Sequence, residues 1–143
     1  MKKFKLAVFI SGNGSNLQAL INASKSSDCP FKIELVFSNN PNAFGLARAS
    51  QSDIPILTLD HKAFKTRQEF DATLSKKLEQ INFDLIVLAG FMRILSKDFI
   101  KKYENRIVNL HPSLLPKYPG LNTHEKVLEL SLIHISEPTR PLY

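Results

Sequence analysis

Short apolar runs alternate with amphipathic segments along most of this chain, and that alternation is the strongest constraint on its fold. Apolar runs without polar alternation are typical of strands buried on both faces of a parallel sheet. Such runs occur at residues 4–10, 33–38, 54–59, 85–89 and 106–110. The sequence therefore predicts a doubly wound, mostly parallel α/β sheet.

Apolar residues at helical spacing separate these runs, over residues 17–25, 44–51 and 67–80. Ser96 stands where it can cap a further short helix. Pro55 has no backbone N–H to donate, so the third run is predicted near an edge of the sheet. A length of 143 residues, with no internal repeat or linker, predicts one domain.

The composition excludes several classes of protein. Hydrophobic residues make up 43% and charged residues 22%, as in ordinary soluble domains. The single cysteine, Cys29, rules out a disulfide framework and a cysteine-based zinc site. No apolar run reaches the roughly 18 residues of a transmembrane helix, and the first strand lacks a signal-peptide cleavage pattern. We therefore expect a cytoplasmic protein without membrane partners.

The net charge of +6 comes from lysines and arginines spread through the chain. No block of five like charges occurs, so a basic nucleic-acid-binding tail is excluded. We interpret the excess mainly as a solvated surface. Binding of anionic metabolites is the second interpretation, and nucleic acid, which we do not expect as a partner, is the third.

A glycine-rich turn, residues 11–17, stands between the first predicted strand and the first predicted helix and reads Ser-Gly-Asn-Gly-Ser-Asn-Leu. Glycines allow positive φ and close backbone approach, and a helix N-terminus offers free N–H groups and a positive dipole end. Together they can bind a phosphate. The segment is neither a Walker loop nor a dinucleotide-binding fingerprint, and many such turns merely connect a strand to a helix.

Two further segments follow predicted strands. Residues 89–95 combine a glycine, an apolar stretch and Arg93, which can pair with an anion or an internal acid. Asn109 and His111 point the same way along the last strand, where an amide and an imidazole can stabilise a developing oxyanion or move a proton. Each segment also fits a structural role alone. No histidine spacing indicates a metal site.

These three segments together closely resemble the phosphoribosylglycinamide formyltransferase family, the folate-dependent enzymes of de novo purine synthesis. The resemblance runs in order and spacing from about Phe4 to Glu129. It implies a formyltransferase-like, Rossmann-type sheet, truncated at the C-terminus. It also implies transfer of a formyl group from 10-formyltetrahydrofolate, as co-substrate, to the amine of 5-phosphoribosylglycinamide, without a metal.

The resemblance also implies roles for individual residues. The family binds the ribonucleotide phosphate through its glycine-rich loop, which corresponds here to Gly14, Ser15 and Asn16. The family's catalytic asparagine and histidine fall on Asn109 and His111. The positions that match its folate-binding residues are Arg67, Met92, Arg93, Ile94, Leu95 and Asn109.

The family's third catalytic residue, an aspartate, lies downstream of the matching region, so we expect this chain by itself to be an inactive fragment. Asn122 also replaces a histidine that is frequent in the family. Two alternatives stay open. One is a related folate enzyme of the same fold, either methionyl-tRNA formyltransferase or formyltetrahydrofolate hydrolase; the other is a non-catalytic nucleotide-binding fragment. The glycine-rich loop favours a small phosphorylated substrate.

The last residues form a separate case. Residues 130–140 resemble the translation of a sequencing-library transposon adapter. We therefore predict a formyltransferase domain, N-terminal part, over residues 1–129 and an artefactual tail over residues 130–143. The competing interpretation is a genuine C-terminal strand followed by proline-rich coil.

Overall fold

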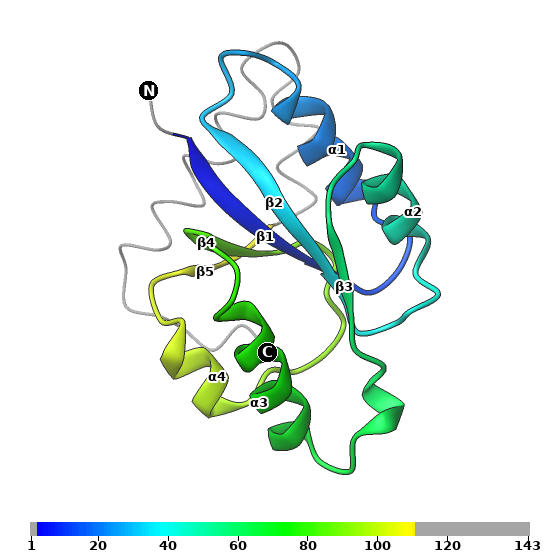
Figure 1. The fold of residues 1–143 in the computed structure, drawn as a ribbon, viewed down its shortest axis with the longest axis vertical. Coiled ribbons are helices and arrows are strands. Elements are labelled where there is room, and N and C mark those ends of the chain that lie inside the picture. Colours follow the sequence, from blue (N-terminus) through cyan, green and yellow to red (C-terminus); the bar gives the residue numbers. More distant parts are fainter. Residues whose placement is uncertain (1–2, 111–143) are drawn as a thin grey trace.

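A five-stranded sheet organises the molecule (Figure 1). The computed structural model describes residues 3–110. All four pairings between neighbouring strands are parallel, and the spatial order is β3-β2-β1-β4-β5. The strands are β1 (Phe4–Ile10), β2 (Phe31–Ser38), β3 (Ile56–Thr58), β4 (Leu85–Leu88) and β5 (Ile107–Asn109).

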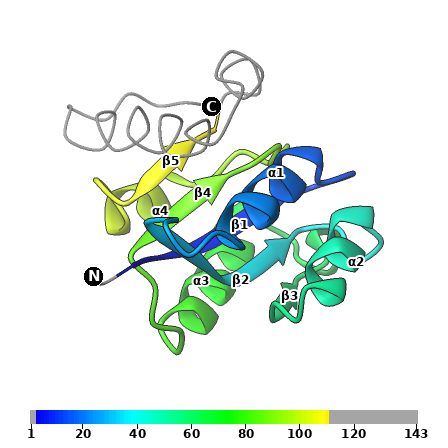
Figure 2. The ribbon, with the colours of Figure 1, turned by 90° about the horizontal axis from the view of Figure 1, so that it is seen from above.

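Helices cover both faces of this sheet (Figures 1 and 2). They are α1 (Ser15–Ser24), α2 (Phe44–Gln51), α3 (Arg67–Leu78) and α4 (Lys97–Lys102), with a short 3-10 helix, η1, at His61–Ala63. The α1 and α2 helices pack on one face, and α3 and α4 pack on the other. Within residues 3–110, none of the helices has the length and apolarity needed to cross a membrane.

The alternation of side chains along β1 explains why the sheet needs helices on both sides. Leu6, Val8 and Ile10 lie in the core beneath α1 and α2, whereas Ala7 and Phe9 lie in the core beneath α3 and α4. All five side chains are fully buried. A strand apolar on both faces is stable only where both faces are covered.

The predicted doubly wound α/β fold is confirmed, with differences at element ends. β2 begins at Phe31 instead of Ile33, because Phe31 pairs with Phe4 and is buried. β3 spans only Ile56–Thr58, and as predicted it lies at an edge, where β2 is its neighbour. The 3-10 helix η1 was not predicted, although His61, its first residue, was expected to lie in a turn.

Local side-chain caps account for where two helices begin. The Ser96 hydroxyl oxygen accepts a hydrogen bond from the Phe99 N–H at 3.2 Å, which confirms the predicted cap of α4. The Thr66 hydroxyl oxygen accepts from the Glu69 N–H at 3.1 Å in the same way and starts α3. Both caps stand directly beside segments that the sequence singled out.

The strand order creates a crevice at the carboxyl ends of β1 and β4. From β1 the chain moves outward to β2 and β3, and then crosses over to β4 on the other side of β1. Because parallel crossovers are right-handed, the two directions place their helices on opposite faces. The loops that follow β1 and β4 therefore diverge, and ligands of open α/β sheets bind at such points.

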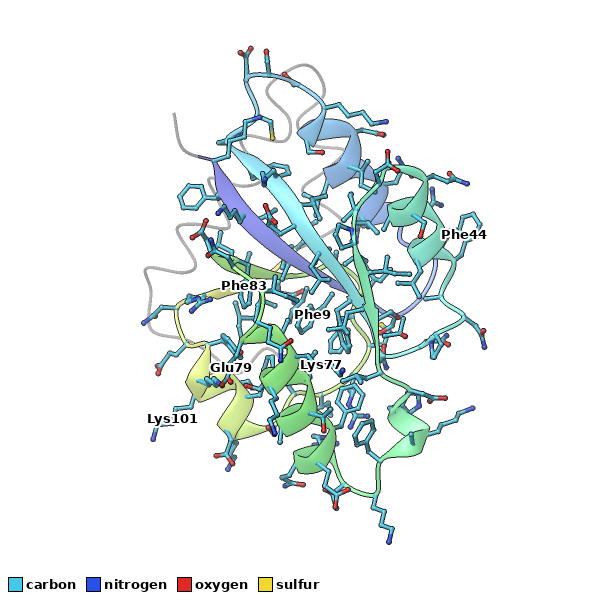
Figure 3. The ribbon with its side chains drawn as sticks, in the orientation of Figure 1. Phe9, Phe44, Lys77, Glu79, Phe83 and Lys101 are labelled. Atoms are coloured by element: carbon cyan, nitrogen blue, oxygen red, sulfur yellow. The ribbon has the colours of Figure 1, made fainter. Side chains whose placement is uncertain are left out.

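Phe9 tests the contribution of the α3–α4 side of the core (Figure 3). Its ring is fully buried and lies 4.9 Å from the ring of Phe37, centre to centre. We expect Phe9→Ala to lower the free energy of unfolding by about 3–5 kcal/mol, measured by urea denaturation, because it leaves a cavity. Phe44→Ala is the control: that ring is 58% exposed, so a loss of about 1 kcal/mol or less is expected. Similar losses for both variants would contradict this assignment.

Candidate functional site

The glycine-rich loop adopts a conformation that only glycine takes without strain. Gly14 has φ of +79° and is the N-cap of α1, which no side-chain hydrogen bond caps. A Cβ atom on Gly14 would lie 2.7 Å from the Cα of Gly45 in α2. The loop therefore fits tightly against α2, and it leaves the first amides of α1 at the carboxyl edge of the sheet. Ser15 is exposed and Asn16 half-buried at that edge.

Arg48 of α2 braces this loop. Its Nε donates to the Asn13 carbonyl oxygen at 2.8 Å, and its Nη2 donates to the Asn13 side-chain oxygen at 2.9 Å. Its Nη1 donates to Gln18 Oε1 at 3.2 Å. The sequence analysis missed Arg48, because no local pattern links it to a loop 35 positions earlier in the chain.

The β4–α4 loop, residues 89–96, contains the second predicted segment, residues 89–95, and one hydroxyl connects it to the end of β1. The Met92 N–H donates to Ser11 Oγ at 2.7 Å, and that hydroxyl donates to Asn39 Oδ1 at 2.8 Å. Ser11 thus joins the segments that follow β1, β2 and β4. Gly90 has φ of +79°, and no heavy atom of the other described residues, its chain neighbours aside, lies within 4 Å of the position of a Cβ there. Glycine is needed at this position for the turn and not for close packing.

A cleft of about 630 Å³ lies between these segments. Its described lining is cationic on balance, with Lys62, Arg67 and Arg93 against the carboxylate of Asp60. The cleft also includes Met92 and Ile94, whose side chains are 84% and 50% exposed. An opening that combines exposed apolar side chains with a positive balance suits a flat ligand that carries carboxylates or a phosphate.

The predicted folate-binding residues separate into two groups. Arg67, Met92, Arg93 and Ile94 line this cleft together. Leu95 instead has a side chain that is only 3% exposed and packs in the core on the α3–α4 side. Leu95 also lies on the wall of a neighbouring cleft, which shares Arg67 and Ile94 with the first.

Arg93 is held against α3. Its guanidinium carbon lies 4.1 Å from the ring centre of Phe70, and its Nε is buried without a hydrogen-bond partner among the described residues. Burial lowers the pKa of Arg93, and the charge of Asp71 partly offsets this, while Arg67 adds to the lowering. A guanidinium in this setting keeps its charge and gains from an anionic ligand.

Asn109 ends β5, in register with Leu88 of β4, and its side chain is half-buried. The prediction that His111 shares its face of the strand lies outside the described residues, as does everything predicted for residues 130–143. Over residues 3–110, no group of three histidine, cysteine or acidic side chains is placed to hold a metal ion.

The fold and the cleft are those of open α/β proteins. In this class, ligands bind where neighbouring strands, here β1 and β4, connect to opposite sides of the sheet. Comparison with protein-family models identifies the class: the formyl transferase family matches residues 4–131, so this chain belongs to that family.

Several named proteins are similar to this chain in sequence and in structure. Phosphoribosylglycinamide formyltransferase of Escherichia coli is 51% identical over 124 residues, which cover 87% of this chain and 58% of the relative. The trifunctional purine biosynthetic protein adenosine-3 of Drosophila melanogaster is 49% identical over 130 residues, 90% of this chain and 10% of that protein. Among solved structures, phosphoribosylglycinamide formyltransferase from Coxiella burnetii superposes with a TM-score of 0.73 at 48% identity, covering 90% of this chain and 61% of that chain. The chain thus spans about three fifths of the length of its bacterial relatives.

Substitutions in the glycine-rich loop test its geometry. We expect Gly14→Ala to lower the free energy of unfolding by about 1–3 kcal/mol, because it forces a non-glycine residue into positive φ and against Gly45. Gly12→Ala, two positions away, is the matched control, since within the part of the chain that the structure describes nothing beyond its chain neighbours lies within 4 Å of a Cβ there, and a change within about 0.5 kcal/mol is expected. Thermal melting of both variants gives the comparison. Equal melting temperatures would show that Gly14 is not conformationally required.

Proposed function

We propose that this chain carries the ribonucleotide-binding and folate-binding part of a phosphoribosylglycinamide formyltransferase. The reaction is transfer of a formyl group from 10-formyltetrahydrofolate to the amine of 5-phosphoribosylglycinamide. The observation that carries the proposal is the pair of hydrogen bonds made by Ser11, which join the glycine-rich turn to the loops that line a cleft with a positive balance of charge. The names of the bacterial relatives agree with this reaction.

We assign the ribonucleotide phosphate to Gly14, Ser15 and Asn16. The positive φ of Gly14 turns the chain into α1, and among residues 3–110 no side-chain hydrogen bond caps this helix. The first N–H groups of α1 and the helix dipole favour a dianionic phosphate. Arg48 adds positive charge nearby through its contacts with Asn13.

We assign the folate to the cleft. The benzoyl ring of the folate is flat and apolar, which suits contact with Met92 and Ile94, while Leu95 supports the loop from the core. The glutamate carboxylates of folate suit the guanidinium groups of Arg67 and Arg93. No metal takes part in this assignment.

We assign the chemistry to the Asn109 amide, at the end of β5, and to the imidazole of His111. The substrate amine attacks the formyl carbon, and a tetrahedral oxyanion forms. The Asn109 amide and a protonated His111 stabilise that charge more than they stabilise the ground-state carbonyl, which lowers the barrier. As the bond to N10 of the folate breaks, protonated His111 donates its proton to N10, and the neutral imidazole then accepts the proton lost by the amine. The family's downstream aspartate would hold His111 in its charged form.

Competition between acceptors tests this function. The chain is joined to the downstream segment of the Escherichia coli relative and supplied with 10-formyltetrahydrofolate, together with phosphoribosylglycinamide and methionyl-tRNA in equal amounts. We expect formyl transfer to the ribonucleotide only. Transfer to tRNA, or release of formate without an acceptor, would assign the chain to one of the two related folate enzymes. The 143-residue chain by itself should bind the ribonucleotide but show no transfer.

His111→Ala in the same fusion protein tests the oxyanion assignment. We expect kcat to fall by about 10²–10⁴-fold with little change in KM, because the imidazole acts in the transition state. His61→Ala is the control: His61 lines the cleft and lies 3.2 Å from the Asn39 carbonyl oxygen through Nδ1, so its loss should change KM for the folate more than kcat. A normal kcat for His111→Ala would leave that residue only a structural role.

A further inference from the structure

Two hydrogen bonds to side chains outside the β4–α4 loop hold this loop against the rest of the protein. At its start, the Met92 N–H donates to Ser11 Oγ at 2.7 Å. At its end, the Ser96 N–H donates to Asp71 Oδ2 at 2.5 Å. Between these two attachments the chain presents Met92, Arg93 and Ile94 to the cleft. The loop is therefore a short bridge whose shape depends on two side chains from elsewhere in the fold.

Asp71 is an unusual residue for its position. It lies on α3 with its side chain only 3% exposed, among the apolar residues that pack α3 against the sheet. Its second oxygen, Oδ1, has no hydrogen-bond partner among the described residues. A buried carboxylate is costly compared with an apolar side chain of similar size, so core packing alone does not account for an aspartate here.

The charge of Asp71 explains how Arg93 stays at the cleft. Arg93 stacks on Phe70, the neighbour of Asp71 on α3. Arg67, at the start of the same helix, is a like charge facing Arg93, whereas Asp71 is an opposite charge. Without the carboxylate, Arg93 would be partly desolvated beside another cation, and moving out to solvent would be favourable.

We propose that Asp71 and Ser11 are positioning residues that anchor the two ends of the β4–α4 loop and so hold Met92, Arg93 and Ile94 in the geometry that binds folate. This inference rests on the proposed function. It adds Asp71, which neither the sequence nor the family resemblance assigned to the site, and it gives Ser11 of the glycine-rich turn a role toward the folate. Neither residue needs to touch the reacting atoms, because both act through the loop.

Asp71→Asn tests the anchor with little change in shape. The asparagine keeps an acceptor for the Ser96 N–H but loses the negative charge, so the charge-assisted hydrogen bond weakens. In the full 143-residue chain without ligand, we expect amide hydrogen exchange at residues 92–96 to speed up at least tenfold. Asp98→Asn is the matched control, since Asp98 is exposed in the first turn of α4, and exchange in the loop should be unchanged.

Ligand affinities separate a positioning role from a general loss of structure. By calorimetry, we expect Asp71→Asn to weaken tetrahydrofolate binding about tenfold while affinity for phosphoribosylglycinamide changes less than twofold. Ser11→Ala, a second variant that frees the other attachment of the loop, should weaken tetrahydrofolate binding by a similar factor. Equal loss of both ligands in Asp71→Asn would indicate a purely structural residue and would overturn the inference.

The outcomes also separate this inference from the proposed function. If the unsubstituted chain binds tetrahydrofolate and Asp71→Asn binds it equally well, the inference is wrong and the proposed function stands. If the unsubstituted chain binds neither ligand, the proposed function fails, and the positioning role for folate fails with it. If amide hydrogen exchange at residues 92–96 is unchanged in Asp71→Asn, Asp71 does not anchor the loop, whatever the two ligand affinities are.

Discussion

The geometry of the candidate site depends on the two hydrogen bonds made by the Ser11 hydroxyl. It accepts from the Met92 N–H and donates to Asn39 Oδ1, so a single side chain satisfies groups that follow three different strands. Those strands are parallel, and their carboxyl ends meet at one edge because β1 lies between β2 and β4. The glycine-rich loop and the cleft therefore lie at the same edge of the sheet, and Ser11 belongs to both.

The rigidity of that edge comes from the two cores beneath it. β1 is buried on both faces, and aromatic rings on the α3–α4 side pack around Phe9, including Phe91 of the β4–α4 loop at 5.4 Å between ring centres. On the other face, Gly14 and Gly45 bring α2 against the first loop. Backbone that would otherwise be mobile is thus supported from both layers. This support is what a site requires when its charged groups must be in place before the ligand arrives.

Much of this arrangement could be predicted from the sequence. The five apolar runs correspond to the five strands, and Ser96 caps α4 as its hydroxyl chemistry indicates. The positive φ at Gly14 and Gly90 agrees with the expectation that glycines permit such turns. The short strand β3 was overestimated, because an edge strand is limited by its single neighbour and not by its own apolar run. The roles of His111 and of residues 130–143 stay predictions.

The sequence by itself determined the class of fold, the places where chain direction changes and the residue types available at the strand ends. These features follow from the period of the side chains and from the conformational limits of glycine and proline, which act over a few residues. Only the tertiary structure decided that Arg48 braces Asn13, that Asp71 holds Ser96 and that Ser11 connects three loops. Each of these contacts joins positions at least 25 residues apart. Their partners are set by strand order and helix packing, which no local pattern encodes.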